Sequence, residues 1–183
     1  MRIAISGAHF SGKSTLIAAL LKQLPNYTSV DEPYFLLEEE GYEFSNPPSL
    51  EDFEQQLKRS MAEIKKSGKN TIFDRCPFDC LAYALAIEES IDADDWTLRI
   101  EETIERLDLI VFVPVEKRIP VPASEDLKLR GHVDELLQEM LLEDSLGILG
   151  DTEVLEVTGS LSKRVEMLKS KVLLHDLKEL KYR

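Results

Sequence analysis

The stretch GAHFSGKST, residues 7–15, constrains the possible folds of this chain more than any other feature of its sequence. It fits the pattern G-x-x-x-x-G-K-[ST], with Gly7, Gly12, Lys13 and Ser14 at the fixed positions. Glycine permits backbone angles that other residues resist, so successive N–H groups of such a loop can turn inward on an anion. An apolar run precedes the loop and a helical pattern follows it, which is the setting in which this pattern binds phosphate.

Individual positions of the loop have predicted tasks in holding ATP and Mg²⁺. The loop opens a helix whose free N–H groups and dipole attract phosphate. Lys13 is expected to reach the β- and γ-phosphates, and the Ser14 hydroxyl to ligate Mg²⁺. The alternative for His9 is that it does not contact the nucleotide and is a packing or solvent-facing residue. The predicted nucleotide-binding residues of the loop are Gly7, Ala8, His9, Phe10, Ser11, Gly12, Lys13, Ser14 and Thr15.

The rest of the chain alternates predicted strands with predicted helices. An apolar run without alternation at 109–115 is typical of a strand buried on both faces of a parallel sheet. Strands that alternate with helices predict an α/β fold in three layers, a parallel sheet with helices on both faces. Strands are expected at 2–6, 27–31, 70–74, 109–115 and 153–157, and helices at 13–24, 49–66, 78–90, 94–107, 130–149 and from about 161 onward.

Length and composition predict one globular domain over residues 1–183. A chain of 183 residues buries enough surface for one substantial core, and no segment approaches the roughly 20 apolar residues of a membrane span. The segment at 114–131 is rich in proline and charge, and we expect it to form a mobile, lid-like loop. The net charge of -13 disfavours nucleic acid and anionic membranes as partners, so an anionic substrate needs a local positive pocket.

Features of the chain also favour a cytoplasmic protein. Met1-Arg2 leads directly into a predicted strand rather than into a secretory signal. Cys76 and Cys80 have no second pair or histidine cluster with which to complete a zinc site, so we expect reduced thiols.

Acidic residues follow two of the predicted strands on the side where the glycine loop lies. Asp74 closes the strand at 70–74 and is followed by Arg75, and Glu32 follows the strand at 27–31. In an open parallel sheet, ligands bind at the carboxyl ends of the strands. Asp74 is therefore predicted to hold Mg²⁺, and Arg75 to bind the acceptor or a phosphate. Asp108 begins a strand at the opposite edge of the sheet, which argues against it as the magnesium ligand. A strand-end ion pair is the alternative for Asp74 and Arg75.

Glu32 is the predicted acceptor of a substrate hydroxyl proton. Pro33 follows it and biases its backbone toward extended geometry. An acidic turn on an acidic protein is the alternative.

The order of these motifs resembles that of the small P-loop kinases of the nucleoside and nucleotide kinase group. Deoxynucleoside kinases are similar in placing Glu-Pro after the second strand, and thymidylate kinases in placing Asp-Arg after the third. The segment DRCPFD, residues 74–79, is also similar to the D-R-x-P-x-D of small AAA-like ATP-binding proteins related to the ribosylnicotinamide kinase domain. The resemblance implies a P-loop NTPase sheet with strand order 2-3-1-4-5, a lid over ATP, and Glu32 as the catalytic base.

The resemblance also implies nucleotide contacts outside the glycine loop. Kinase lids carry arginines that neutralise the transferring phosphoryl group, which makes Arg118 and Arg130 candidates, although solvated charge in a loop is the alternative for each. Gly159, in Thr158-Gly159-Ser160, matches a loop that packs beside adenine, or is a turn residue.

These observations favour a magnesium-dependent kinase with catalytic residues Lys13, Glu32, Asp74 and Arg75. It would transfer the γ-phosphate of ATP to a hydroxyl or phosphate on a small acceptor, with a nucleoside-like molecule favoured. The alternatives are a regulatory NTPase switch that acts on a protein partner, in which Glu32 orients a water, and a binding module without catalysis.

Two further predictions concern the acceptor pocket and the last helix. The acceptor pocket is expected to draw on Tyr34, Phe35, Phe53, Gln56 and Arg59, or else these residues serve the core and surface. The last helix is expected to pack on its own domain through Val165, Leu168, Val172 and Leu173, with a homodimer contact as the alternative.

Overall fold

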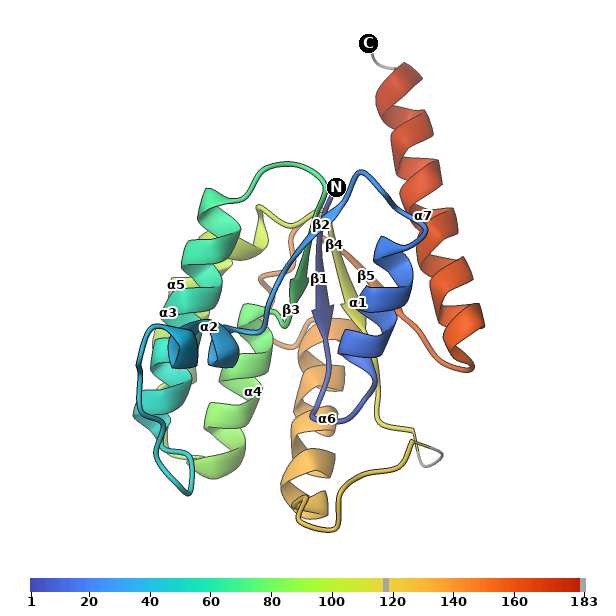
Figure 1. The fold of residues 1–183 in the computed structure, drawn as a ribbon. Helices are drawn as coiled ribbons and strands as arrows, with labels where there is room; N and C mark the ends of the chain where they lie inside the picture. The colour runs from blue at the N-terminus through green and yellow to red at the C-terminus, as the bar shows by residue number, and fades with distance from the viewer. Residues whose placement is uncertain (117–118, 182–183) are drawn as a thin grey trace.

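The computed structural model describes residues 1–116 and 119–181 and shows a three-layer α/β/α sandwich (Figure 1). The central sheet has five parallel strands in the order β2-β3-β1-β4-β5, as predicted. The strands are β1 Arg2–Ser6, β2 Thr28–Val30, β3 Thr71–Asp74, β4 Leu109–Phe112 and β5 Glu153–Glu156. The helices are α1 Lys13–Leu21, α2 Pro33–Glu39, α3 Leu50–Lys66, α4 Pro77–Ile87, α5 Ala93–Ile104, α6 Leu127–Leu142 and α7 Leu161–Lys181.

Side chains of the central strands alternate between two apolar cores. Ile3 and Ile5 of β1 pack with α1 and α7, while Ala4 between them packs with the helices on the other face. In Figure 1, α1 and α7 lie on one side of the sheet and α2 to α6 on the other. Both faces of β1 and β4 are therefore covered, which explains why these strands read as continuous apolar runs.

Some element boundaries differ from the sequence predictions for local reasons. The strand β4 stops at Phe112, two residues before Pro114, which has no N–H to donate to a sheet ladder. The short helix α2 was not predicted, and it begins at Pro33 because proline suits the first helical position. The helix α6 begins at Leu127, so the end of the expected loop at 114–131 is helical.

The helix α3 begins with a reciprocal cap. The Ser49 side chain accepts a hydrogen bond from the backbone N–H of Asp52, and the Asp52 carboxylate accepts from the N–H of Ser49. This reciprocal pair is a capping box. It fixes the start of the helix that forms one wall of the pocket described below.

The last helix packs on its own domain through most of the predicted residues. Val165, Leu168 and Val172 are buried in the core shared with α1, whereas Leu173 is 51% exposed and lies outside it. None of the described helices combines the length and apolar character needed to cross a membrane.

Replacing Leu57 with alanine should destabilise the fold strongly. Leu57 lies on α3 and is fully buried, so the change leaves a cavity and is expected to cost about 2–5 kcal/mol of unfolding free energy. Denaturant unfolding of Leu57→Ala measures this loss. Leu98→Ala is the matched control, because Leu98 is 71% exposed on α5 and its loss should change stability little. Equal midpoints for both variants would contradict the assignment of the core.

Candidate active site

The glycine loop connects β1 to α1 at the carboxyl edge of the sheet. Gly7 has φ 150° and Gly12 has φ 96°, which L side chains rarely adopt. A Cβ on Gly7 would also lie 2.4 Å from the backbone oxygen of Val113. The first glycine is therefore required both by its backbone conformation and by its close approach to the end of β4.

Lys13 is buried at the start of α1 and its ammonium group faces back into the loop. Its Nζ donates to the backbone oxygens of Gly7 at 2.8 Å and Ala8 at 2.9 Å. Burial, followed by the positive charge of Arg75, lowers the pKa of Lys13 to about 8. A buried cation beside a loop of backbone N–H groups is an arrangement that attracts phosphate.

Ser14 and Asp74, the two predicted Mg²⁺ ligands, lie close together at the carboxyl edge of the sheet. The Ser14 hydroxyl donates to Asp74 Oδ2 at 2.8 Å, although 60 positions separate them in sequence. Asp74 Oδ1 is buried and has no hydrogen-bond partner among the residues that the structure describes. Magnesium in nucleotide sites takes one or two protein oxygens together with phosphate oxygens and water. The hydroxyl and the unpaired carboxylate oxygen fit such an ion.

Arg75 lies across from Glu32, and the two side chains form an ion pair. Arg75 Nε donates to Glu32 Oε1 at 2.5 Å, and the Arg75 side chain is 4% exposed. Burial acts to raise the pKa of Glu32, but the attraction and the hydrogen bond of Arg75 outweigh it and hold that pKa below its ordinary value. Glu32 is therefore a carboxylate at neutral pH. The sequence had placed both residues at strand ends but had not paired them.

Asp79 joins the glycine loop to Arg75, a role that the sequence analysis missed. Its Oδ1 accepts from the backbone N–H of Gly7 at 3.0 Å and lies 3.3 Å from Arg75 Nη1. Its Oδ2 accepts from the N–H of Cys76 at 2.9 Å, which caps α4. The final aspartate of DRCPFD was the available signal. Its carboxylate is fully buried and links three segments of the site.

A pocket of about 780 Å³ runs from the glycine loop to Glu32 and Arg75. Among the predicted acceptor residues, Arg59 does not line it, because its guanidinium pairs with Glu40 and Glu63. The other four do, and the segment before α3 adds residues that the sequence had not indicated. The lining of this acceptor side comprises Tyr34, Phe35, Phe44, Ser45, Asn46, Pro48, Phe53 and Gln56.

The other predicted nucleotide contacts are Gly159, which is not among the residues that line the pocket, His9, which is, and Arg118. The N–H of Gly159 donates to Glu116 Oε1 at 2.8 Å, and its φ of 94° fits a glycine turn. The exposed ring of His9 lies 4.8 Å from the ring of Tyr83, which agrees with a packing contact. Arg118 lies outside the described residues. Asp108 accepts a hydrogen bond from the N–H of Arg2 at the opposite edge of the sheet, far from the glycine loop in register.

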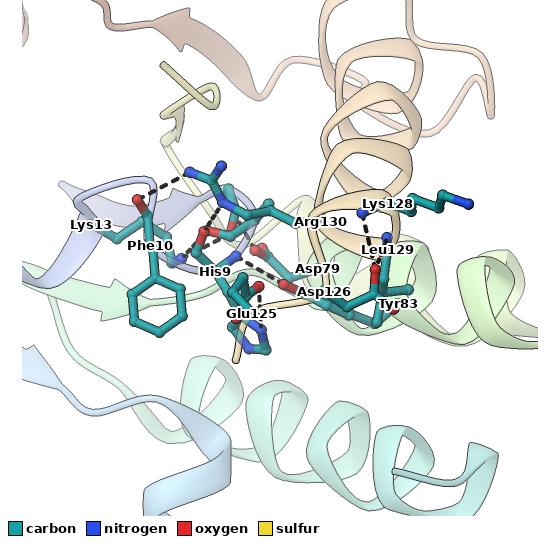
Figure 2. A network of polar contacts seen from close by, with 12 residues as sticks. His9, Phe10, Lys13, Asp79, Tyr83, Glu125, Asp126, Lys128, Leu129 and Arg130 are labelled. Carbon is teal, nitrogen blue, oxygen red and sulfur yellow. Dashed lines mark hydrogen bonds and ion pairs between the residues drawn. The ribbon is translucent and has the colours of Figure 1, made fainter. Parts of the chain in front are cut away.

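Arg130 lies on α6 with only 7% of its surface exposed, rather than in a solvated loop. Its guanidinium donates to the backbone oxygens of His9 and Phe10, in the glycine loop (Figure 2). The structure thus brings Arg130 to the phosphate loop, but against its carbonyl groups.

Comparisons with solved structures identify the fold. Deoxyadenosine kinase from M. mycoides with bound dATP superposes with a TM-score of 0.64 at 19% identity, covering 94% of this chain and 98% of that one. The same enzyme with the products dCMP and a flexible dCDP superposes with a TM-score of 0.65, also at 19% identity and with the same coverage. Thymidylate kinase from Candida albicans superposes with a TM-score of 0.65 at 17% identity, covering 96% of this chain and 92% of that one. At these identities the likeness shows a shared fold.

No curated protein matches the sequence. The family model described as an AAA domain matches residues 2–164, which include the glycine loop and every strand. The chain therefore belongs to this AAA domain family and has the fold of the small P-loop nucleoside and nucleotide kinases.

Proposed function

We propose that this protein is a kinase that transfers the γ-phosphoryl group of MgATP to a hydroxyl of a nucleoside-like acceptor. The observation that carries the proposal is one continuous pocket that Lys13 and Ser14 of the glycine loop, the Glu32–Arg75 pair and a set of aromatic side chains line together. A hydrolase needs a place for a water beside the γ-phosphate. Here the pocket of about 780 Å³ also has aromatic walls, which suit a small organic acceptor.

The residues in and beside the pocket have separate roles in the proposed reaction. The N–H groups of the loop and Lys13 hold the phosphates, and Ser14 with Asp74 would hold Mg²⁺. The ion supplies charge neutralisation at the β- and γ-phosphates. Glu32 accepts the proton of the acceptor hydroxyl while a new bond forms between its oxygen and the γ-phosphorus. The bond from that phosphorus to the bridging oxygen breaks, and ADP leaves.

The charges in the pocket favour a hydroxyl over a phosphate as the acceptor group. Of the described residues that line it, Lys13 and Arg75 carry full positive charges, and Lys13 serves the phosphates of ATP. Arg75 already contacts the carboxylates of Glu32 and Asp79. A monophosphate placed beside Glu32 would meet like charge, whereas a neutral hydroxyl would donate its proton to it.

Aromatic side chains on the acceptor side favour a flat ring in the substrate. Tyr34 and Phe44 stack at 4.2 Å, and Phe53 lies 5.5 Å from Tyr83 with nearly parallel rings. Gln56 has an amide in the same wall and can both donate to and accept from a base edge. This combination supports a nucleoside-like acceptor.

The direct test is ATP turnover measured with and without a panel of nucleosides, nucleoside monophosphates and other small alcohols. We expect ADP release that depends on a nucleoside, together with a phosphorylated product detected by mass spectrometry. Equal turnover across the whole panel, with inorganic phosphate as the product, would replace the kinase by a hydrolase. Strong preference for a monophosphate would overturn the hydroxyl acceptor while keeping the kinase.

Nucleotide binding should take up a proton near pH 8. In the free protein Lys13 has a pKa of about 8, and its charged neighbours are Arg75, Asp79, Asp74 and Glu32. Phosphate oxygens beside its ammonium raise that pKa, so the complex keeps a proton that the free protein loses. Affinity for MgATP should therefore fall as pH rises from about 7 to about 9.5.

Calorimetry in buffers of different ionisation enthalpy measures this proton uptake. Lys13→Met should abolish the uptake in this range, since it removes the titrating group. An affinity that stays constant across the range would show that the ammonium group does not contact phosphate.

A further inference from the structure

Two arginines from α6 and α7 hold the glycine loop by its backbone oxygens. Arg130, on α6, donates from Nε to the oxygen of His9 at 2.7 Å and from Nη2 to that of Phe10 at 3.3 Å. Arg164, on α7, donates from Nη1 to the oxygen of Ser11 at 3.1 Å. Both guanidinium groups belong to residues more than nine-tenths buried, Arg130 being 7% exposed and Arg164 4%. Figure 2 shows the Arg130 contacts on the loop.

Arg130 grips the loop at its least favourable backbone conformation. Phe10 has φ 54°, in the left-handed region that a residue with a Cβ adopts only at a cost. The peptide groups on both sides of Phe10 present their oxygens to the same guanidinium. One planar fork with two donors can thus fix both planes that define this strained residue.

Arg164 is itself held in place by the segment after β4. Its Nη2 lies 2.6 Å from Glu116 Oε1, and that oxygen also accepts from the N–H of Gly159. A Cβ added to Gly12 would lie 3.3 Å from Arg164 Nη1, so the arginine packs directly against the second loop glycine. The guanidinium therefore has a fixed partner on one side and the loop on the other.

The direction of a peptide oxygen determines where the next N–H points. In a trans peptide the C=O and the N–H that follows it point in opposite directions. Arg130 holds the oxygens of His9 and Phe10, and so directs the N–H of Phe10 away from α6. Arg164 holds the oxygen of Ser11 and so directs the N–H of Gly12 away from α7. Inward N–H groups are what such a loop offers to phosphate.

We propose that Arg130 and Arg164 are positioning residues that orient the loop's peptide groups for phosphate, without contacting the nucleotide themselves. This inference rests on the proposed nucleotide site and extends it to α6 and α7. It also assigns Arg130 a different task from the one that its place in the lid region suggested. A lid arginine contacts the γ-phosphate directly, whereas a loop-positioning arginine acts on every phosphate that the loop holds.

Affinity for a series of adenine nucleotides separates these two roles. Calorimetry with AMP, MgADP and MgATP is carried out on Arg130→Met, Arg164→Met and the control Arg106→Met. Arg106→Met removes the same charge from the turn that follows α5, where the Arg106 side chain is 42% exposed. For the two loop arginines we expect MgADP and MgATP to bind about 10- to 100-fold more weakly, as for lost charged hydrogen bonds, with AMP unchanged. Arg106→Met should match the wild type.

Several results would overturn the inference. A loss confined to MgATP would make Arg130 a γ-phosphate contact. A lower melting temperature with unchanged affinities would make either arginine merely structural. A wild type that binds none of the nucleotides would instead remove the proposed function, and the two failures are thereby distinguished.

A double-mutant cycle with Phe10→Gly tests the action on the strained residue. Glycine adopts φ 54° without the steric cost, so the loop should need Arg130 less. Arg130→Met is therefore expected to cost at least threefold less MgADP affinity in the Phe10→Gly background than in the wild type. Equal losses in both backgrounds would contradict the mechanism. If Arg130→Met does not fold, Arg130→Lys replaces it in the cycle, because lysine keeps the charge but lacks the planar fork.

Discussion

Glu32→Gln is expected to lower the turnover of nucleoside-dependent phosphate transfer by about 10²- to 10⁴-fold, the range that a positioned general base contributes. Glutamine fills the same space beside Arg75 but cannot accept the proton of the acceptor hydroxyl. The carboxylate is available in the wild type because Arg75 holds the pKa of Glu32 below its ordinary value. Protonation of Glu32 itself should therefore lower activity only as pH drops through that lowered pKa, whereas burial raises the pKa of Asp74, the proposed Mg²⁺ ligand.

The affinity of Glu32→Gln for MgATP shows whether its lower turnover comes from the missing base or from a damaged nucleotide site. Glu32→Gln should bind MgATP nearly as the wild type does, since the hydrogen bond of Glu32 is to Arg75 rather than to the glycine loop. Glu38→Gln is the matched control, because Glu38 is exposed on α2, the helix that Glu32 precedes, and its loss should leave turnover unchanged. Turnover of Glu32→Gln within threefold of the wild type would show that another group, or none, accepts the proton.

Lys13→Met is expected to remove most of the thermal stabilisation by MgATP and to lower turnover by about 10²- to 10³-fold. The ammonium of Lys13 donates hydrogen bonds to the backbone oxygens of Gly7 and Ala8, at distances of 2.8 and 2.9 Å. Phosphate oxygens of a bound nucleotide can replace these two acceptors. Methionine keeps a similar length and volume without the charge. The expected result is a melting temperature that barely rises on addition of MgATP.

Lys22→Met serves as the control for this variant. Lys22 follows the same helix α1 and is exposed, so the same change of charge occurs outside the pocket. Differential scanning fluorimetry across a range of MgATP concentrations gives both responses. A midpoint shift in Lys13→Met equal to that of the wild type would contradict the assignment of the phosphate loop.

Most of the fold could be predicted because its signals are local in sequence. Each signal comes from the segment that it describes: the glycine pattern indicates the phosphate loop, the apolar run at 109–115 a buried strand, and Ser49 the start of a helix. Boundaries were less accurate where a single residue decides them, as Pro33 does at the start of α2. The predicted helix contact of Leu173 failed because helical periodicity gives a face but not how far the neighbouring core extends.

The candidate site was predictable only in part. Ser14 and Asp74 follow strands that the topology makes neighbours, so their meeting at 2.8 Å follows from strand order. The pairing of Arg75 with Glu32 depends on rotamers and on the turn into α2, which no sequence pattern specifies. Arg164 gave no signal of its own, since a buried guanidinium looks in sequence like any surface charge, and Asp79 gave only its place at the end of DRCPFD.

The sequence by itself determined the α/β class, the phosphate loop and the strand ends at which polar residues would gather, because backbone preference and hydrophobic periodicity act over a few residues. Only the tertiary structure decided which charges meet there. Arg164 reaches Ser11 across 153 positions of chain and Arg130 reaches His9 across 121. Such contacts depend on how α6 and α7 pack against the sheet edge. That packing is a property of the two assembled cores rather than of any single segment.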